Sequence, residues 1–241
     1  MNPVALINPD TPGLIRKALH RHHVATLEVP RCRLVAPPVS GHPDLQLFPC
    51  RESIVVHPGM PLQFTCRLEK IFSLQVKRGQ SPLSNDHPAD CPYNVACTGK
   101  FAFHNTSYTD PAIISMLQSL GLPLLHVPQG YTRCATMVVD VNAVISADRK
   151  ICGAASNAGL AVLQVQPGHV ALPGYRYGLI GGASGTYNAT VYFAGSLATH
   201  PDGTAIREFI HSREIDLVEL SGEPLYDLGS IFILDGNPEY I

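Results

Sequence analysis

The sequence has no tryptophan, few charges and no long apolar run. Charged residues make up 15% of the 241 residues, and the formal net charge is −2. No apolar segment approaches the roughly 20 residues that a helix needs to cross a bilayer, and no basic excess favours a nucleic acid or an anionic membrane as a partner. Residues 1–6 lack a cationic start and a long apolar stretch, so we expect no signal peptide and a cytoplasmic protein.

The cysteines predict neither a metal centre nor a disulfide framework. There are seven, an odd number, and no pair is spaced as C-x-x-C. Cys91 and Cys97 are six residues apart, which does not match the spacing of zinc sites. His20, His22 and His23 lie together at the end of the first predicted helix, without a carboxylate partner. We therefore expect reduced thiols in a cytosol, no metal and no cofactor.

What the sequence does contain is a weak fivefold repeat. A short apolar–polar–apolar strand followed by a turn recurs at 27–29, 74–76, 125–127, 163–165 and 218–220. With 20 glycines and 21 prolines, the chain has the composition of many short elements joined by tight turns. The spacing of the repeats is uneven, which is not typical of a solenoid and fits units arranged around an axis.

Each repeat is predicted to begin with a helix, over 13–22, 61–70, 110–120, 148–158 and 203–212. The third helix has the clearest signals, because Asp110 can cap it, Pro111 suits its first turn and its apolar stripe stops at Gly121. Second strands are predicted near 43–48, 94–98, 134–139, 177–182 and 228–234. Third strands are predicted at 53–56, 101–103, 143–145 and 191–193, and we expect the fifth repeat to lack one because the chain ends.

These elements predict a single α/β domain, a pseudo-fivefold propeller of five helix–strand–strand–strand units. The approximate units are 1–59, 60–106, 107–147, 148–195 and 196–241. The polar middle positions of the repeated strands are Glu28, Gln75, His126, Gln164 and Glu219. By alternation they point away from the face that their neighbours bury, so they form either a polar ring along a solvent-filled axis or ordinary solvent-facing positions.

Five such units around an axis resemble the pentein fold of the guanidino-group-modifying enzymes. More narrowly, four segments resemble an uncharacterised bacterial family assigned to that fold. They are 91–94 running on to 103–110, then 129–134, 177–185 and 224–231. The resemblance covers most of the chain from about 40 to 235, and it implies a pentein-like domain without implying an activity.

The resemblance leaves two classes of function open. Catalytic penteins attack an amidine or guanidinium carbon with a cysteine on the second strand of the last unit. Here that strand, 227–234, contains no cysteine, and the last cysteine of the chain is Cys152. A ribosome anti-association factor shares the fold without catalysis. The chain is therefore either a hydrolase or transferase acting on a guanidine or amidine compound, or a non-catalytic binding protein of the same fold.

The second strands carry the residues expected to form a site. If these strands surround one axis, polar residues on all five converge there: Asp44, Asn94, Cys134, Ser184 and Asp227. The two carboxylates can hold a cationic amidine through charge-assisted hydrogen bonds. Cys134 can attack its carbon if the thiolate is stabilised, or it fills a small buried space as free cysteines often do.

Three further residues complete the predicted site. His104 has an unperturbed pKa near neutrality, which suits a general acid or base; alternatively it bonds the backbone at the helix start. Its neighbour Asn105 is a candidate for ligand binding. Arg133 can lower the pKa of Cys134 only if it turns toward the sulfur, against the usual alternation of a strand. We thus predict Cys134, His104 and Asp44 as catalytic residues.

The sequence does not predict an oligomeric state. It does predict residues that bind a small molecule in a central pore. They are Asn94, Asn105, Arg133, Ser184 and Asp227. The glycine-rich segment 177–185 lacks the lysine of a P-loop and the spacing of a dinucleotide fingerprint. Its glycines instead favour close backbone packing, or a bulge, near the axis.

Overall fold

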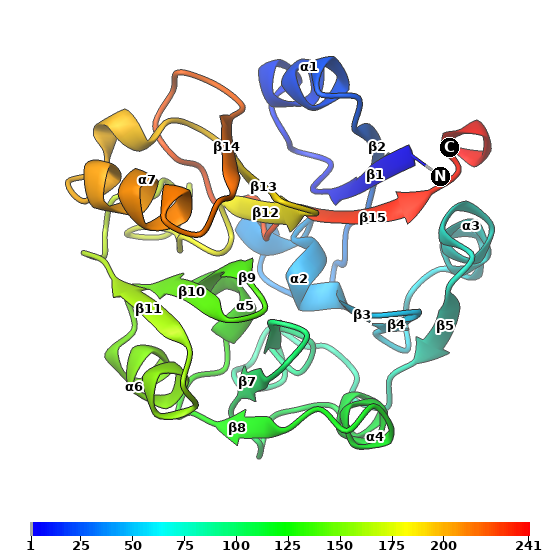
Figure 1. Ribbon diagram of the computed structural model, residues 1–241. Coiled ribbons are helices and arrows are strands. Elements are labelled where there is room, and N and C mark those ends of the chain that lie inside the picture. Colours follow the sequence, from blue (N-terminus) through cyan, green and yellow to red (C-terminus); the bar gives the residue numbers. More distant parts are fainter. Residues whose placement is uncertain (1) are drawn as a thin grey trace.

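The computed structural model describes residues 2–241, which form five three-stranded sheets of the same internal order. In each sheet an inner strand pairs antiparallel with a middle strand, which pairs parallel with an outer strand. Four sheets are β3 (Leu47–Cys50), β4 (Ser53–Val56) and β5 (Gln75–Arg78); β6 (Ala96–Cys97), β7 (Ala102–His104) and β8 (Leu124–His126); β9 (Thr136–Asp140), β10 (Ala143–Ser146) and β11 (Ala161–Gln164); and β12 (Ser184–Tyr187), β13 (Thr190–Phe193) and β14 (Asp216–Glu219). Figure 1 shows the sheets arranged around the middle of the molecule.

The fifth sheet joins the two ends of the chain. Its middle strand is β1 (Asn2–Ile7), which pairs antiparallel with β15 (Phe232–Gly236) and parallel with β2 (Ala25–Glu28). The expectation that the last repeat lacks its third strand was therefore wrong, because the first residues of the chain supply it. Figure 1 shows β1 and β15 side by side in this sheet.

Helices connect the middle strand of each sheet to the outer strand. The five predicted helices are present as α1 (Gly13–Arg21), α3 (Leu62–Phe72), α4 (Pro111–Ser119), α6 (Arg149–Asn157) and α7 (Gly203–His211). They lie on the outside of the molecule in Figure 1. Short 3₁₀ turns occur at Pro37–Val39, Leu197–Thr199 and Pro238–Tyr240. Within residues 2–241, no helix combines the length and the hydrophobicity needed to cross a membrane.

The predicted second strands begin later than expected, because a helical turn or loop precedes several of them. The stretch 43–46 is a single turn, α2 (Pro43–Gln46), with Pro43 at its first position, where the fixed φ suits a helix start. The stretch 132–135 is a similar turn, α5 (Thr132–Ala135). Residues 177–182 form a loop, and the strand begins at Ser184. The polar residues expected on inner strands therefore lie mostly in the turns before them.

The repeated apolar–polar–apolar strands are the outer strands of their sheets, far from the middle of the molecule (Figure 1). Their polar members do not form an axial ring. Four of the five are exposed, and Glu219 is half-buried. The ring hypothesis is wrong, and ordinary solvent-facing alternation explains the pattern.

The apolar core is divided among the spaces between neighbouring sheets. One cluster, for example, combines Phe103 of β7, Val144 of β10, and Ile151 and Ala155 of α6, all fully buried. The other four clusters likewise join two sheets and the helix between them. The apolar side chains therefore lie between the sheets, whereas the turns near the middle of the molecule carry polar residues.

The cap of α4 also ties down a neighbouring loop. Asp110 Oδ1 accepts a hydrogen bond from the N–H of Ala112 at 2.8 Å, as predicted for the cap. Its Oδ2 accepts from the N–H groups of Gln80 (2.8 Å) and Ser81 (2.6 Å) and from the Tyr93 hydroxyl (3.1 Å). We expect Asp110→Ala to lower the free energy of unfolding by about 2 kcal/mol, since the cap and partly buried donors are lost together.

Asp148, the cap of α6, gives a matched control. It accepts from the N–H groups of Lys150 (2.7 Å) and Ile151 (3.1 Å), and its third contact is the side chain of Gln129 at 3.1 Å. Asp148→Ala should cost about 1 kcal/mol, the usual worth of a cap. Equal losses for the two variants in urea denaturation would contradict the anchoring role of Asp110.

Candidate functional site

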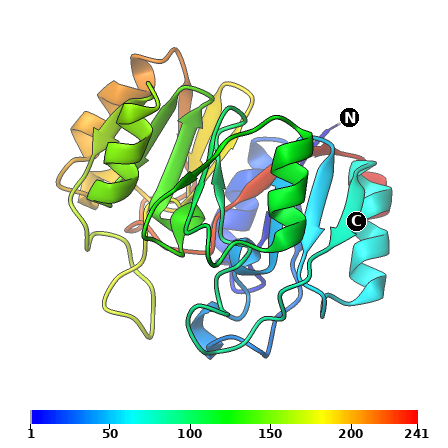
Figure 2. The same cartoon turned by 90° about the horizontal axis from the view of Figure 1, so that it is seen from below.

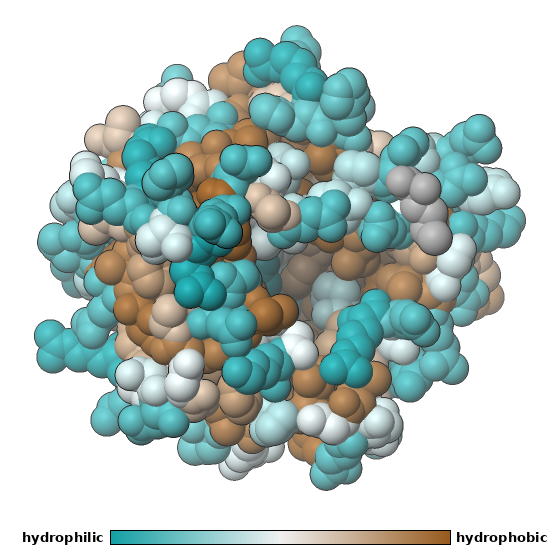
Figure 3. Space-filling model, viewed as in Figure 1, coloured by the Kyte–Doolittle hydropathy of each residue, from teal (hydrophilic) through white to brown (hydrophobic). Residues whose placement is uncertain are grey.

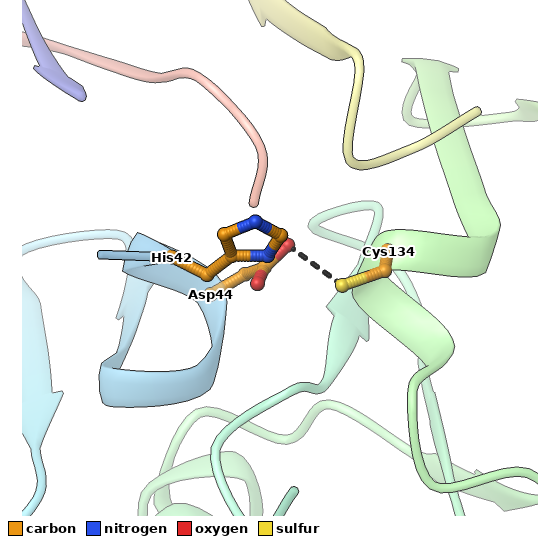
Figure 4. Close-up of side chains that lie close together, drawn as sticks. All are labelled: His42, Asp44 and Cys134. Carbon is orange, nitrogen blue, oxygen red and sulfur yellow. Dashed lines mark hydrogen bonds between the residues drawn. The ribbon is translucent and has the colours of Figure 1, made fainter. Parts of the chain in front are cut away.

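Four turns that precede inner strands meet near the middle of the molecule. His42 and Asp44 come from the turn at α2, Asn94 precedes β6, Cys134 lies in α5 and Asp227 precedes β15. Figure 4 shows His42 and Asp44 on one turn, with Cys134 pointing toward them from another. The structure thus brings together four of the residues predicted for the site and adds His42.

The thiol of Cys134 is held by two polar side chains. Its Sγ donates to Asp44 Oδ2 at 3.0 Å and accepts from Asn94 Nδ2 at 3.0 Å (Figure 4 shows the first of these). Asn94 Oδ1 accepts from the backbone N–H groups of Arg133 (2.9 Å) and Cys134 (3.1 Å). Asn94 therefore positions both the thiol and the turn that carries it.

Asp44 has one carboxylate oxygen without a partner. Its Oδ2 accepts from Cys134 and from the Ser230 hydroxyl at 2.7 Å, whereas Oδ1 has no hydrogen-bond partner within residues 2–241. The residue is only 1% exposed. A buried polar atom without a partner costs free energy, so this oxygen can accept a hydrogen bond from a ligand at little further cost.

Asp227 lies in a closely packed cradle of backbone. Its Oδ2 accepts from the N–H of Leu179 at 2.8 Å and its Oδ1 from that of Gly229 at 2.9 Å. His42 Nδ1 lies 3.9 Å from the same Oδ1. A Cβ on Gly182 would lie 2.0 Å from Asp227 Oδ1. The glycine-rich segment thus permits close backbone packing, as the sequence predicted.

A cavity of about 230 Å³ opens above these residues. Cys134, His42 and Asp227 line its inner part, and Tyr131, Tyr175 and Tyr177 add aromatic surface. Segments near residues 40 and 170 project from the same side of the molecule in Figure 2 and form part of its wall. A cavity with aromatic walls and a few convergent polar groups is typical of a small-molecule site.

Burial and the two neighbouring carboxylates favour the protonated form of the Cys134 thiol. Burial raises the pKa of Cys134 well above its ordinary value, and the charges of Asp44 and Asp227 raise it further. Burial also raises the pKa of Asp227, as does the nearby charge of Asp44, against the lowering effect of His42. A cation bound between these groups would reverse the electrostatic part of both shifts. The thiol is therefore neutral at pH 7, and a positive charge placed between the carboxylates would favour the thiolate.

This electrostatic arrangement predicts the pH dependence of alkylation. Because the raised pKa leaves little thiolate at pH 7, neutral iodoacetamide should alkylate Cys134 slowly there. The rate should rise only above the ordinary thiol pKa of about 8.5. Exposed Cys66 gives an internal control in the same mass-spectrometric time course. Equal rates for Cys134 and Cys66 at pH 7 would rule out the raised pKa.

Arg133 lies beside Cys134 in α5 and Ser184 begins β12, but neither residue lines this cavity. The Arg133 guanidinium donates to the carbonyls of Thr136 (3.1 Å) and Gly181 (3.3 Å) and lines a separate cavity of about 170 Å³ among the inner strands. Ser184 Oγ donates to the Gly181 carbonyl at 3.1 Å. Arg133 and Cys134 thus point to different cavities.

Figure 3 shows one face of the molecule, which is hollowed near its middle.

His104 and Asn105 lie away from the Cys134 cavity. His104 Nε2 donates to the Gly130 carbonyl at 2.7 Å, and Nδ1 lies 2.8 Å from the Thr109 hydroxyl. Burial lowers the pKa of His104 to about 4, so the ring is neutral at pH 7. Asn105 Oδ1 accepts from the N–H of Ser107 at 3.1 Å in the turn before α4. Asn105 therefore bonds the backbone before the helix start, whereas His104 bonds the carbonyl of a distant loop and the Thr109 side chain.

The sequence reasoning missed His42 and Ser230. His42 lies two residues before Asp44, so the convergence that predicted Asp44 could have pointed to it. Ser230 comes from the strand segment in which a cysteine was sought. Its φ of 70° is in the left-handed region, which costs a non-glycine residue about 1 kcal/mol. That strained backbone directs the hydroxyl to Asp44, and no sequence pattern indicated it.

The fold is that of the penteins. The chain is similar to a dimethylarginine dimethylaminohydrolase from Pseudomonas aeruginosa solved with citrulline, with a TM-score of 0.53, 11% identity and 92% of each chain covered. It is also similar to a dimethylarginine dimethylaminohydrolase adduct with S-methyl-L-thiocitrulline, with a TM-score of 0.55, 13% identity, and 92% of this chain and 93% of that chain covered. A substrate-bound C. jejuni agmatine deiminase gives a TM-score of 0.51 at 9% identity, over 83% of this chain and 71% of that chain.

At the level of sequence, the chain belongs to a family of unknown function, DUF6873, whose model matches residues 6–232. No curated protein matches the sequence. The sequence identity to these structures is far below 25%, so the similarity establishes the fold alone. The chemistry has to be inferred from the residues of the site.

Proposed function

We propose that this protein binds a cationic amidine or guanidine at the floor of the Cys134 cavity and that Cys134 attacks its carbon. One observation carries the proposal: a buried thiol contacts a carboxylate that has an unpartnered oxygen, and it lines a cavity of ligand size together with the second carboxylate, Asp227. Asp44 and Asp227 supply the negative charge that an amidinium requires. The tyrosines supply surface on which a planar cation can stack.

The geometry supports a covalent reaction in two stages. When the cation binds, the Sγ–H proton passes to Asp44 Oδ2, which already accepts that hydrogen bond. The thiolate forms the S–C bond while the C=N electron pair moves to nitrogen. The C–N bond to the leaving amine then breaks, with a proton supplied by His42, which lines the cavity. Water in a hydrolase, or an amine in a transferase, then attacks the resulting thioimidate carbon and gives a proton to His42. The C–S bond breaks, and the sulfur of Cys134 takes back the proton held by Asp44.

The binding half of the proposal is tested by removing one charge. We expect Asp44→Asn to weaken binding of benzamidine by about 30-fold, because losing one partner of a buried charge pair costs roughly 2 kcal/mol or more. Isothermal titration of the intact chain measures this. Asp216→Asn, on the exposed edge of β14, is the matched control and should leave the affinity unchanged. Equal affinities for the two variants would contradict a role for Asp44.

A non-catalytic binding protein is the second candidate, and one observation favours it. The segment 227–234, where catalytic penteins carry their cysteine, has none here. A screen of small amidines and guanidines for released amine or ammonia separates the two candidates. Benzamidine binding with no turnover of any compound would favour the binding protein.

We also infer that the five sheets form a pseudo-fivefold propeller that works in the cytoplasm. The pairing of β1 with β15 supports the first inference, since it joins the two ends of the ring of sheets. Seven unbonded cysteine thiols support the second, since disulfides are rare in reducing compartments.

A further inference from the structure

Three buried side chains beside the cavity offer the donor set of a zinc site. We propose that His42, Asp44 and Cys134 bind a divalent cation of the zinc class, in competition with a cationic organic ligand. No metal site was expected from the sequence, because Cys134 is 90 residues from Asp44 and the three residues form no ligand-spacing motif. The inference goes beyond the proposed function, since the metal could bind whether or not the protein catalyses a reaction.

The positions of the donor atoms support the site. The ligand atoms of the three side chains all lie within 4.8 Å of one another. Zinc holds nitrogen, oxygen and sulfur donors at about 2.0–2.3 Å in a tetrahedron, which places donors roughly 3.5 Å apart. Small side-chain rotations therefore suffice to close the site, and Figure 4 shows the three side chains already converging.

The unpartnered oxygen of Asp44 is a second, independent observation that points to a ligand. Oδ2 is occupied by the Cys134 and Ser230 donors, and Oδ1 is buried with no partner within the described chain. A metal ion would satisfy Oδ1 while leaving the Ser230 hydrogen bond in place. The exposed fraction of Asp44 is 1%, so solvent does not compete strongly for this oxygen.

The surroundings suit a bound cation. Asp227 Oδ1 lies 3.9 Å from His42 Nδ1 and can orient the ring as carboxylates commonly do behind metal-bound histidines. The guanidinium of Arg133, the residue next to Cys134, is directed toward the carbonyls of Thr136 and Gly181. Binding exchanges one proton for the metal: the Cys134 S–H bond breaks, an S–metal bond forms and the proton leaves to solvent.

Three protein ligands leave a fourth position, which would face the cavity because His42 and Cys134 line it. A site with an open position is typical of exchangeable or catalytic zinc, in contrast to the closed sites of structural zinc. The thiolate and imidazole donors favour Zn²⁺ or Co²⁺ over Mg²⁺ and Ca²⁺.

Cobalt provides the test, because a thiolate bound to Co²⁺ gives a charge-transfer absorption band. We expect the metal-free native protein to develop this band with one equivalent of Co²⁺, and Zn²⁺ or benzamidine to remove it. Cys134→Ser should abolish the band. Asp44→Asn and His42→Gln should retain the thiol but weaken Co²⁺ binding at least about tenfold, as loss of a ligand requires.

The second cluster of potential ligands gives the matched control. His87, Asp90 and Cys91 also place donor atoms within 4.8 Å of one another, in one loop in which His87 is exposed and Cys91 is buried. Cys91→Ser should leave the cobalt band and its affinity unchanged. No band in the native protein, a band that persists in Cys134→Ser, or a band lost in Cys91→Ser would each overturn the proposal. If Cys134→Ser does not fold, the affinities of Asp44→Asn and His42→Gln decide it.

Discussion

Cys134→Ala should reduce turnover of the best amidine or guanidine substrate by about 10³-fold or more, because loss of a covalent nucleophile removes the principal reaction path. The alanine should leave benzamidine binding largely intact, since Asp44 and Asp227 remain. Steady-state kinetics and titration of the same preparation separate the two effects. The result is specific to this thiol because its Sγ alone among the seven cysteines adjoins both the cavity and Asp44.

Cys66→Ala is the control for this measurement. Cys66 lies on the exposed side of α3, away from the cavity, so its removal should change neither turnover nor binding. Turnover that survives in Cys134→Ala would contradict the covalent role of Cys134, even if the carboxylates proved essential.

Gly182→Ala should destabilise the fold by about 3 kcal/mol or more. A Cβ at this position would lie 2.0 Å from Asp227 Oδ1 and 2.4 Å from its Cγ, closer than atoms can pack. Asp227 cannot simply move aside, because Leu179 and Gly229 hold both of its oxygens. Overpacking of this kind commonly costs 1–3 kcal/mol and occasionally more. Urea denaturation gives the change in the free energy of unfolding.

Gly153→Ala is a glycine substitution with the opposite expectation. Gly153 lies in α6, and a Cβ there would meet nothing within 4 Å. Alanine should stabilise this helix by about 0.5–1 kcal/mol, since it restricts the unfolded chain and favours helix. A Gly182→Ala protein as stable as the native one would show that the loop at 177–183 can move, and would contradict a rigid cradle around Asp227.

The sequence predicted the repeated elements because each has a local signal. The helix α4, for example, begins after Asp110 and Pro111 and buries an apolar stripe, so its cap, its first turn and its buried face all agree. The inner strands were predicted less well, because their first residues form turns at α2 and α5 that no periodicity marks. The pairing of β1 with β15 was missed because it joins residues at opposite ends of the chain.

The site was partly predictable from the repeat pattern. Asp44, Asn94, Cys134 and Asp227 occupy corresponding positions in their repeats, and repeated positions around one axis converge. His104 also had suitable chemistry, but its ring bonds Gly130 and Thr109 in a separate buried network. His42 and the unpartnered oxygen of Asp44 depend on side-chain orientations within a turn, which the repeat pattern does not specify.

The central claim is that the cavity accepts an amidine cation and thereby activates Cys134. The most direct test is labelling with chloroacetamidine at neutral pH, in the presence of a chelator, with mass-spectrometric mapping of native and denatured protein. We expect Cys134 to be labelled faster than exposed Cys66 in the native protein, benzamidine to block this labelling, and the preference to disappear on denaturation. Labelling of Cys134 only after denaturation would contradict it and would identify Cys134 as a packing residue.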